Sequence, residues 1–441
     1  MNKLLVQGIE IHQAPKGFAT PDGMTYGPGS FVISLAQPKM GVIRYLLGRT
    51  FYPDNEYTRD REGTPIRPYD MATDTMAEFM GVRVDPLETP VAGALQKLTG
   101  SVPAVGSVAQ GTFGYALDGR LNDSFRAVNL LLDKNVPVRR VDEPVDGLRR
   151  GDFIVGPGSD GVLADVAKQS GVDVTALKAQ PGQRGREVRR QRIGMYQRYW
   201  GGNMDEGWTR FLLEQFAFPY TSILDAEIKK GGLEARYDVI ILPDDSTAMI
   251  TGERPPASAG RGGFGGQMRP EAFPPEYRSG IGTEGVDALK AFVQKGGTLV
   301  TLGAAGNFAI EKLGLPVRNV LANVPAKEFF CPGSTLKARF DSSHPLAYGM
   351  PTQGLVTFLG GNLAFEIVPN DHNERYETVV VFGERDLLQS GWIVGEQHQF
   401  KKAAMVSAKM GEGRVVLIGF RAQHRAQTHG TFKLLFNALL R

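Results

Sequence analysis

Residues 192–441 alternate between short, uninterrupted apolar runs and amphipathic segments, and this alternation constrains the fold more than any other feature. The runs YDVIILPDD, TLVTLGAAG and RVVLIGF are typical of strands that are buried on both faces of a parallel sheet. The segments MDEGWTRFLLEQF and GVDALKAFVQKGG repeat apolar residues at helical spacing. Because strands and helices alternate with short links, the sequence predicts an α/β domain with a parallel, doubly wound sheet.

Two regions precede this domain. Residues 1–95 predict a β-rich segment, because LLVQGIEIHQA alternates apolar and polar residues and turn residues recur after it. A helix is expected within this segment at 41–47. Residues 96–183 predict a small α/β domain with the strands FGYALDG, PVRRVDEPV and GDFIVGPGSD. Two helices are expected in this domain. The first begins at Asp123, and the second ends at Gly171.

Two polar segments complete the organisation. Residues 184–191 predict a linker, which belongs to the basic run RGREVRRQR. A solvated linker is the first interpretation of such a run, and a phosphate or nucleic-acid patch is the second. Residues 246–281 predict a disordered insertion, because they are rich in Gly and Pro and longer than an ordinary loop between a strand and a helix.

The composition excludes several classes of protein. The 50 basic and 47 acidic residues nearly balance, which argues against a nucleic-acid partner. A single cysteine, Cys331, excludes an internal disulfide, and its apolar surroundings predict a buried structural thiol. No apolar run reaches the roughly 18 residues of a membrane span, and the N-terminus lacks the apolar stretch of a signal peptide. As written, the chain is expected to stay in the cytoplasm.

Polar residues gather where the predicted parallel strands end. Open parallel sheets bind ligands outside the carboxyl ends of their strands, so any binding site is expected there. Paired carboxylates could hold a cation or sugar hydroxyls, and a tryptophan could stack on a sugar ring or a peptide. The alternative is that these residues cap helices and solvate loops. The candidate residues are Asp205, Glu206, Trp208, Asp244, Asp245, Asn307, Gln423 and His424.

The C-terminal domain resembles class I glutamine amidotransferases in its strand-to-helix turn and in its closing segment. That family carries a nucleophilic cysteine on the turn, and a His–Glu pair after a later strand activates it. Here the turn reads LGAAGNFAI, with Ala304, Ala305 and Gly306 at the elbow, so it offers neither thiol nor hydroxyl. The later segment GFRAQHRAQTHGTF retains His424 but has Ala426 in place of a carboxylate. The sequence therefore predicts no catalytic residue of this kind.

A zinc site is not expected in this chain either. The six histidines form neither a His-x-x-Glu nor a His-Glu-x-x-His motif, and His424 and His429 are five residues apart, which does not place them on one helical face. No other cofactor is expected.

Longer stretches resemble the C-terminal region of large bacterial secreted zinc carboxypeptidase-like proteins of the carboxypeptidase A family. They include MDEGWTRFLLEQFAFPYTS, CPGSTLKARFDSSHPLAYGMP and GRVVLIGFRAQHRAQTHGTFKLLFNAL, together with YGPGSFVISLAQP and ALDGRLNDSFRAVNLLL further upstream. The resemblance implies a periplasmic or secreted protein whose peptidase domain binds zinc. This chain lacks that domain's ligand set, so the family's catalytic residues have no counterpart here.

Three functions remain open at this stage. The leading one is a non-catalytic accessory region that supports the peptidase domain, encoded in the same or an adjacent reading frame, or that binds its substrate, such as cell-wall peptide or glycan. The second is a hydrolase with an unrecognised site at the carboxyl edge of the C-terminal sheet. The third is a binding module for a small polar ligand at that edge.

Overall fold

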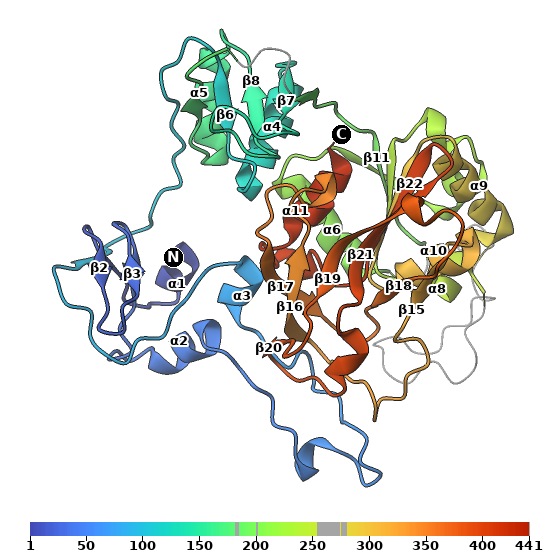
Figure 1. Ribbon diagram of the computed structural model, residues 1–441, viewed down its shortest axis with the longest axis horizontal. Coiled ribbons are helices and arrows are strands. Elements are labelled where there is room, and N and C mark those ends of the chain that lie inside the picture. The colour runs from blue at the N-terminus through green and yellow to red at the C-terminus, as the bar shows by residue number, and fades with distance from the viewer. Residues whose placement is uncertain (181–184, 200–201, 254–273, 275–279, 441) are drawn as a thin grey trace.

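The computed structural model describes residues 1–180, 185–199, 202–253, 274 and 280–440. Figure 1 shows an N-terminal segment in blue and a small domain in teal beside a larger C-terminal domain. The structure thus has the mixed α/β character that the sequence predicts. Among these residues no helix has the length and apolar character needed to cross a membrane.

The C-terminal domain is built on a large mixed sheet whose first part is parallel. Five strands pair in parallel in the order β12-β11-β13-β14-β22. The prediction of parallel strands alternating with helices is confirmed for this part of the sheet. These strands are β11 (Ile193–Tyr196), β12 (Tyr220–Ile223), β13 (Val239–Leu242), β14 (Thr298–Leu302) and β22 (Gly413–Ile418).

The second part of this sheet is antiparallel, and here the prediction of a parallel sheet is wrong. β21 and β22 form a hairpin, whose turn contains Gly411 with φ of +60°, so the chain returns directly instead of crossing over through a helix. Further antiparallel strands extend the sheet from β21. They are β16 (Ser334–Phe340), β17 (Gln353–Phe358), β19 (Tyr376–Phe382) and β21 (Ala403–Met410), with β15 (Val317–Asn319), β18 (Phe365–Ile367) and β20 (Leu388–Ser390) paired beside them.

Helices cover both faces of the parallel strands. Val239 and Ile241 of β13 belong to one core, and the alternate residues Ile240 and Leu242 belong to another. The first core includes residues of α6 (Met204–Gln215) and α11 (Phe432–Leu439). The second includes residues of α7 (Asp225–Lys229), α9 (Gly282–Gln294) and α10 (Ala305–Leu313). A sheet with two buried faces explains why its strands read as continuous apolar runs.

The small domain has a β-α-β-β-α-β order and an antiparallel sheet, which is the split βαβ arrangement. Its sheet order is β10-β7-β8-β6-β9. Strand β10 lies within the predicted linker 184–191, where Arg186 and Glu187 pair with β7, so this part of the linker prediction differs from the structure. The elements are β6 (Tyr115–Leu117), α4 (Asn122–Asp133), β7 (Val138–Arg140), β8 (Phe153–Val155), α5 (Asp160–Ser170), β9 (Thr175–Ala176) and β10 (Arg186–Glu187).

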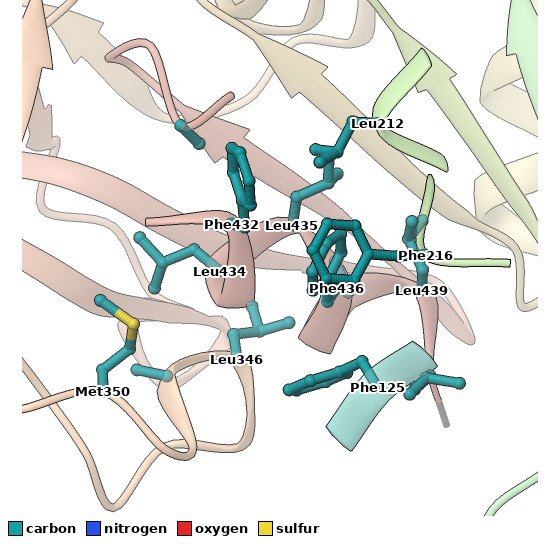
Figure 2. Packing of buried hydrophobic residues seen from close by; sticks show 14 of the residues in the cluster. Phe125, Leu212, Phe216, Leu346, Met350, Phe432, Leu434, Leu435, Phe436 and Leu439 are labelled. Atoms are coloured by element: carbon teal, nitrogen blue, oxygen red, sulfur yellow. The ribbon is translucent and has the colours of Figure 1, made fainter. Parts of the chain in front are cut away.

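Aromatic side chains join the small domain to the C-terminal domain. Phe125 of α4 packs against Phe436 of α11, with ring centroids 5.4 Å apart, inside the cluster shown in Figure 2. Arg140 of β7 is fully buried at the same junction, beside the rings of Phe153 and Tyr348. Burial lowers the pKa of the Arg140 guanidinium to about 9. The two α/β units therefore share one continuous core.

The N-terminal segment has little core of its own. Its only core cluster within the described residues contains Leu4, Ile9, Ile11 and Ile43. The predicted helix near 41–47 is present as α2, but residues 2–6 form a helix where a strand is expected, because so short a window does not separate the two periodicities. The elements are α1 (Asn2–Val6), β1 (His12–Gln13), β2 (Phe18–Ala19), β3 (Thr25–Tyr26), β4 (Phe31–Val32), α2 (Met40–Leu47), α3 (Met76–Met80) and β5 (Gln96–Lys97).

Two further predictions concern single segments. Most of the predicted disordered insertion lies outside the described residues, but Thr247–Thr251 forms helix α8, capped by the Ser246 hydroxyl, so the prediction is wrong for these residues. The prediction of a buried thiol is confirmed, since Cys331 is 2% exposed and burial raises its pKa to about 12.

Candidate functional site

Asp205 lies at the centre of a buried polar network at the carboxyl edge of the parallel strands. Its Oδ1 accepts a hydrogen bond from the Asp244 backbone N–H at 3.0 Å. Its Oδ2 accepts from Arg421 Nη1 and from Gln423 Nε2, each at 2.9 Å. The Gln423 amide also donates to the Thr209 hydroxyl at 2.9 Å. The network thus joins the first turn of α6 to the loops that follow β13 and β22.

Asp244 extends this network to the turn after β14. Its carboxylate forms an ion pair with Arg421 Nη2, and its Oδ1 accepts from the Ala304 backbone N–H at 2.6 Å. Gly303 has φ of +53°, and a Cβ added there would lie 2.2 Å from Asp244 Oδ1. Only glycine fits this position, because the carboxylate occupies the space that a side chain would need.

Burial sets the electrostatics of the network. The Asp205 carboxyl is 4% exposed. Desolvation raises its pKa above the ordinary value, the Asp244 charge adds to this, and Arg421 opposes it. Two carboxylates therefore share one guanidinium in a largely buried position, where the three side chains are 5–17% exposed. Such a cluster is stable only while all three groups remain together.

A second ion pair lies beside the first. Arg198, which follows β11, contacts Asp245 with an Nε–Oδ2 distance of 2.5 Å. Desolvation raises the pKa of Asp245, and the Arg198 charge lowers it. Asn203 links the two pairs, because its amide donates to the Asp244 carbonyl at 3.1 Å while its oxygen caps α6. The candidate carboxylates Asp244 and Asp245 are thus held by arginines.

His424 and Trp208 form a contact of their own, with ring centroids 5.5 Å apart in an edge-on arrangement. His424 is 2% exposed, and neither ring nitrogen has a hydrogen-bond partner in the described part of the chain. Desolvation, followed by the Arg421 and Arg425 charges, lowers the pKa of His424 to about 3. The imidazole is therefore neutral at physiological pH.

The turn that carries His424 is strained. Arg425 and Ala426, within the short helix η8 (His424–Ala426), have φ of +51° and +52°. Residues other than glycine seldom adopt this conformation, and such strain is concentrated at functional sites. The Arg425 guanidinium pairs with Asp70 at 2.6 Å, so the N-terminal segment contacts the turn.

The remaining two candidates lie apart from the network. Glu206 pairs with Arg210 one helical turn further along α6, with an Nε–Oε1 distance of 2.7 Å. Asn307 accepts a hydrogen bond from the Asn319 amide at 3.3 Å. The structure therefore brings together Asp205, Asp244 and Gln423 directly, with Asp245, Trp208 and His424 beside them.

Two arginines that pair with the carboxylates at this edge, Arg421 and Arg198, were not among the residues predicted from the sequence. Arg421 and Arg198 each follow a predicted strand by only a few residues, at the same edge as the carboxylates. Their position after a strand is the signal that could have identified them. Asn362 lacks a comparable signal, since it lies in a loop of the antiparallel part. Its Nδ2 is buried near Gly303 without a hydrogen-bond partner among the described residues.

The His424 pKa predicts a pH dependence of stability. The unfolded chain binds a proton to this histidine below about pH 6.5, whereas the folded chain does not until about pH 3. The free energy of unfolding is therefore expected to fall as the pH drops below about 6.5, by up to about 1.4 kcal/mol per pH unit.

Urea denaturation of wild type and of His424→Leu between about pH 7 and 4 measures this effect. The variant is expected to lose this part of the slope, whereas the same substitution at the exposed His372 should leave it unchanged. An unchanged slope in His424→Leu would contradict the placement of His424.

A metal centre is not apparent in the described residues, where no group of three or more His, Cys, Asp or Glu side chains is placed to hold an ion. The chemistry that this edge offers is hydrogen bonding and ion pairing through Asp244, Asp245, Arg198 and Arg421, whose side chains are 9–17% exposed.

No protein-family model matches the chain, and no curated protein sequence matches it significantly. Among solved structures, a cytoplasmic protein from Salmonella typhimurium is 12% identical with a TM-score of 0.34, over 57% of this chain and 99% of that one. A ThuA-like protein from Bacteroides uniformis is 12% identical with a TM-score of 0.31, over 56% and 89%. A β-galactosidase from Bacillus circulans is 11% identical with a TM-score of 0.33, over 56% and 30%. At these values none of them assigns a family or a function to this chain.

Proposed function

We propose that this chain is a non-catalytic accessory region of a zinc carboxypeptidase-like protein, and that its C-terminal domain is a flavodoxin-like domain of the class I glutamine amidotransferase kind. The strand order supports this fold. Taken in chain order, the five parallel strands lie as second, first, third, fourth and fifth, which is the flavodoxin-like order. The resemblance in sequence supports the kinship with the peptidase family.

The proposal that the chain is non-catalytic rests on the turn after β14. Acyl transfer needs a nucleophile at this position and a base within hydrogen-bond reach. Ala304 and Ala305 offer no such group, and the Asp244 carboxylate accepts the Ala304 N–H beside the turn. His424 is neutral and packed against Trp208. These residues stabilise the sheet edge, and the described part of the turn offers no nucleophile paired with a base.

The accessory role requires a surface that contacts the peptidase domain. The N-terminal segment provides large side chains for such a contact, since Tyr57 is 84% and Tyr69 102% exposed. Aromatic residues of this kind are enriched at interfaces between proteins. We place the contact on this segment.

A titration with the separately produced peptidase domain of the same or the adjacent reading frame tests this role. A complex is expected, and Tyr57→Ser with Tyr69→Ser should weaken it by about tenfold or more. The control is Phe211→Ser on α6, a residue that is 52% exposed on the C-terminal domain. Failure of wild type to bind, or equal weakening by the control, would contradict the accessory role.

A second candidate function, binding of a small polar ligand at the carboxyl edge, rests on unused hydrogen-bonding groups. Asn362 Nδ2 and Gln423 Oε1 are buried beside the network without partners among the described residues. Cell-wall peptides and sugars can be screened by thermal shift. A shift in wild type that Gln423→Leu abolishes would favour this function over the first, whereas turnover of any of these compounds would instead favour a hydrolase.

A further inference from the structure

A cleft of about 530 Å³ lies in the small domain, away from the C-terminal sheet. It is lined by the segment before β6, by the first residue of α5 and by the end of β9, and its lining residues include Phe113, Asp160, Leu177 and Lys178. We propose that this cleft binds a short peptide with free ends, whose ammonium contacts Asp160 and whose carboxylate contacts Lys178. This site is independent of the function proposed above.

Asp160 is a fixed anion at one wall of the cleft. It is the first residue of α5, where the helix dipole favours a negative charge. The buried Tyr115 hydroxyl donates to Asp160 Oδ1, which orients the carboxylate, and the hydroxyl oxygen also lies 3.2 Å from the Gly111 carbonyl oxygen. No cationic side chain within the described ranges pairs with Asp160. A carboxylate has about four acceptor positions, so its exposed side remains available to a ligand ammonium.

Lys178 supplies the opposite charge. It follows β9, is exposed, and forms no ion pair with Asp160 or with any other described residue, although both residues line the same cleft. Two opposite charges that face one cavity without touching each other are both satisfied by a ligand that carries an ammonium and a carboxylate. A neutral sugar would leave both charges without a counter-charge.

Among zwitterionic molecules, a short peptide fits the volume and the apolar lining of the cleft best. A volume of about 300–1,000 Å³ is usual for pockets that hold small molecules, and the cleft falls in this range. Phe113 is 39% exposed, and Leu177 also lines the cleft. Their apolar surface is suited to the side chains of a peptide between its charged ends.

Isothermal titration of the full chain with four probes tests the inference. The probes are alanyl-leucine with free ends, its N-acetyl form, its C-terminal amide, and maltose as a neutral sugar. Alanyl-leucine is expected to bind, and each blocking group should weaken its binding to wild type by about tenfold or more. Acetylation should cost nothing further in Asp160→Asn, and amidation nothing further in Lys178→Met, because each variant has already lost the matching contact.

Matched controls come from the exposed side of α5. Asp165→Asn and Lys168→Met make the same changes of charge outside the cleft and should bind like wild type. Four results would overturn the inference: no binding of alanyl-leucine by wild type, equal binding of all three peptide forms, binding of maltose alone, or equal losses in the control variants. None of these results bears on the accessory role, which is measured with a different partner and different variants.

Discussion

Replacement of Arg421 by methionine is expected to lower the free energy of unfolding by about 3–5 kcal/mol. The substitution removes the only cation that contacts both Asp205 and Asp244 among the described residues. Asp205 is 4% exposed, so water cannot replace the lost partner. The cost is the penalty for leaving carboxylates uncompensated in a buried site, and it is measured by urea denaturation at neutral pH.

A matched control lies four residues away. Arg425 pairs with Asp70, but both side chains are more than one third exposed, so Arg425→Met is expected to cost no more than about 1 kcal/mol. In the Arg421→Met background, Asp244→Asn should recover part of the lost stability, because it removes one of the two negative charges. Equal costs for the two arginine variants would contradict the buried network.

Replacement of Phe436 by alanine is expected to cost a similar amount, about 3–5 kcal/mol, for a different reason. Phe436 is fully buried, and its ring centroid lies 4.8 Å from that of Phe216 and 5.0 Å from that of Phe218. Phe125 reaches the same ring from the small domain (Figure 2). The substitution leaves a cavity at the junction of the two domains.

Because this core is shared, Phe436→Ala should destabilise both α/β units together. Tryptophan fluorescence and far-UV circular dichroism are expected to report one coincident transition at a lower denaturant concentration. Phe211→Ala, at a half-exposed position on α6, should change stability by less than about 1 kcal/mol. A loss below about 1 kcal/mol in Phe436→Ala would contradict the shared core.

The parallel half of the fold could be predicted from the sequence because its signals are local. Strands such as Val239–Leu242 are continuous apolar runs, and helices such as Gly282–Gln294 have a clear apolar face. The antiparallel half is specified by pairing between distant segments. Residues 334–340 pair with β17, β19 and β20, which follow them along the chain and are separated from them by loops, and no local pattern encodes that register.

The location of the candidate site could be predicted from the sequence, but only some of its residues could. The rule for the carboxyl edge of parallel sheets located Asp205, Asp244 and Gln423, which the structure joins in one network. It did not identify Arg421 as their shared partner, because the rule says at which edge of the sheet a site lies and does not say which side chains pair with one another there. Asn307 and Glu206 follow the same rule yet bond to Asn319 and Arg210, since local contacts decide where each side chain turns.

The structure of the N-terminal segment could hardly be predicted from its local sequence. Strands of two residues and a helix of five leave almost no periodicity to read. Its order derives from contacts far along the chain, such as the Thr73 hydroxyl with Ser390 at 2.9 Å and the Tyr52 ring stacked on Trp392. These contacts join residues more than 300 positions apart, so local sequence carries no trace of them.

The most direct test of the account is a turnover measurement on the purified chain alone. Release of ammonia from glutamine, and of C-terminal amino acids from peptides, is measured with and without added zinc. The account predicts no product above the uncatalysed background in either case. The turn after β14 carries Ala304 and Ala305 in place of a nucleophile. Among the described residues no group of three or more His, Cys, Asp or Glu side chains is placed to hold zinc. Turnover of either substrate that Asp244→Asn or His424→Leu abolishes would contradict it.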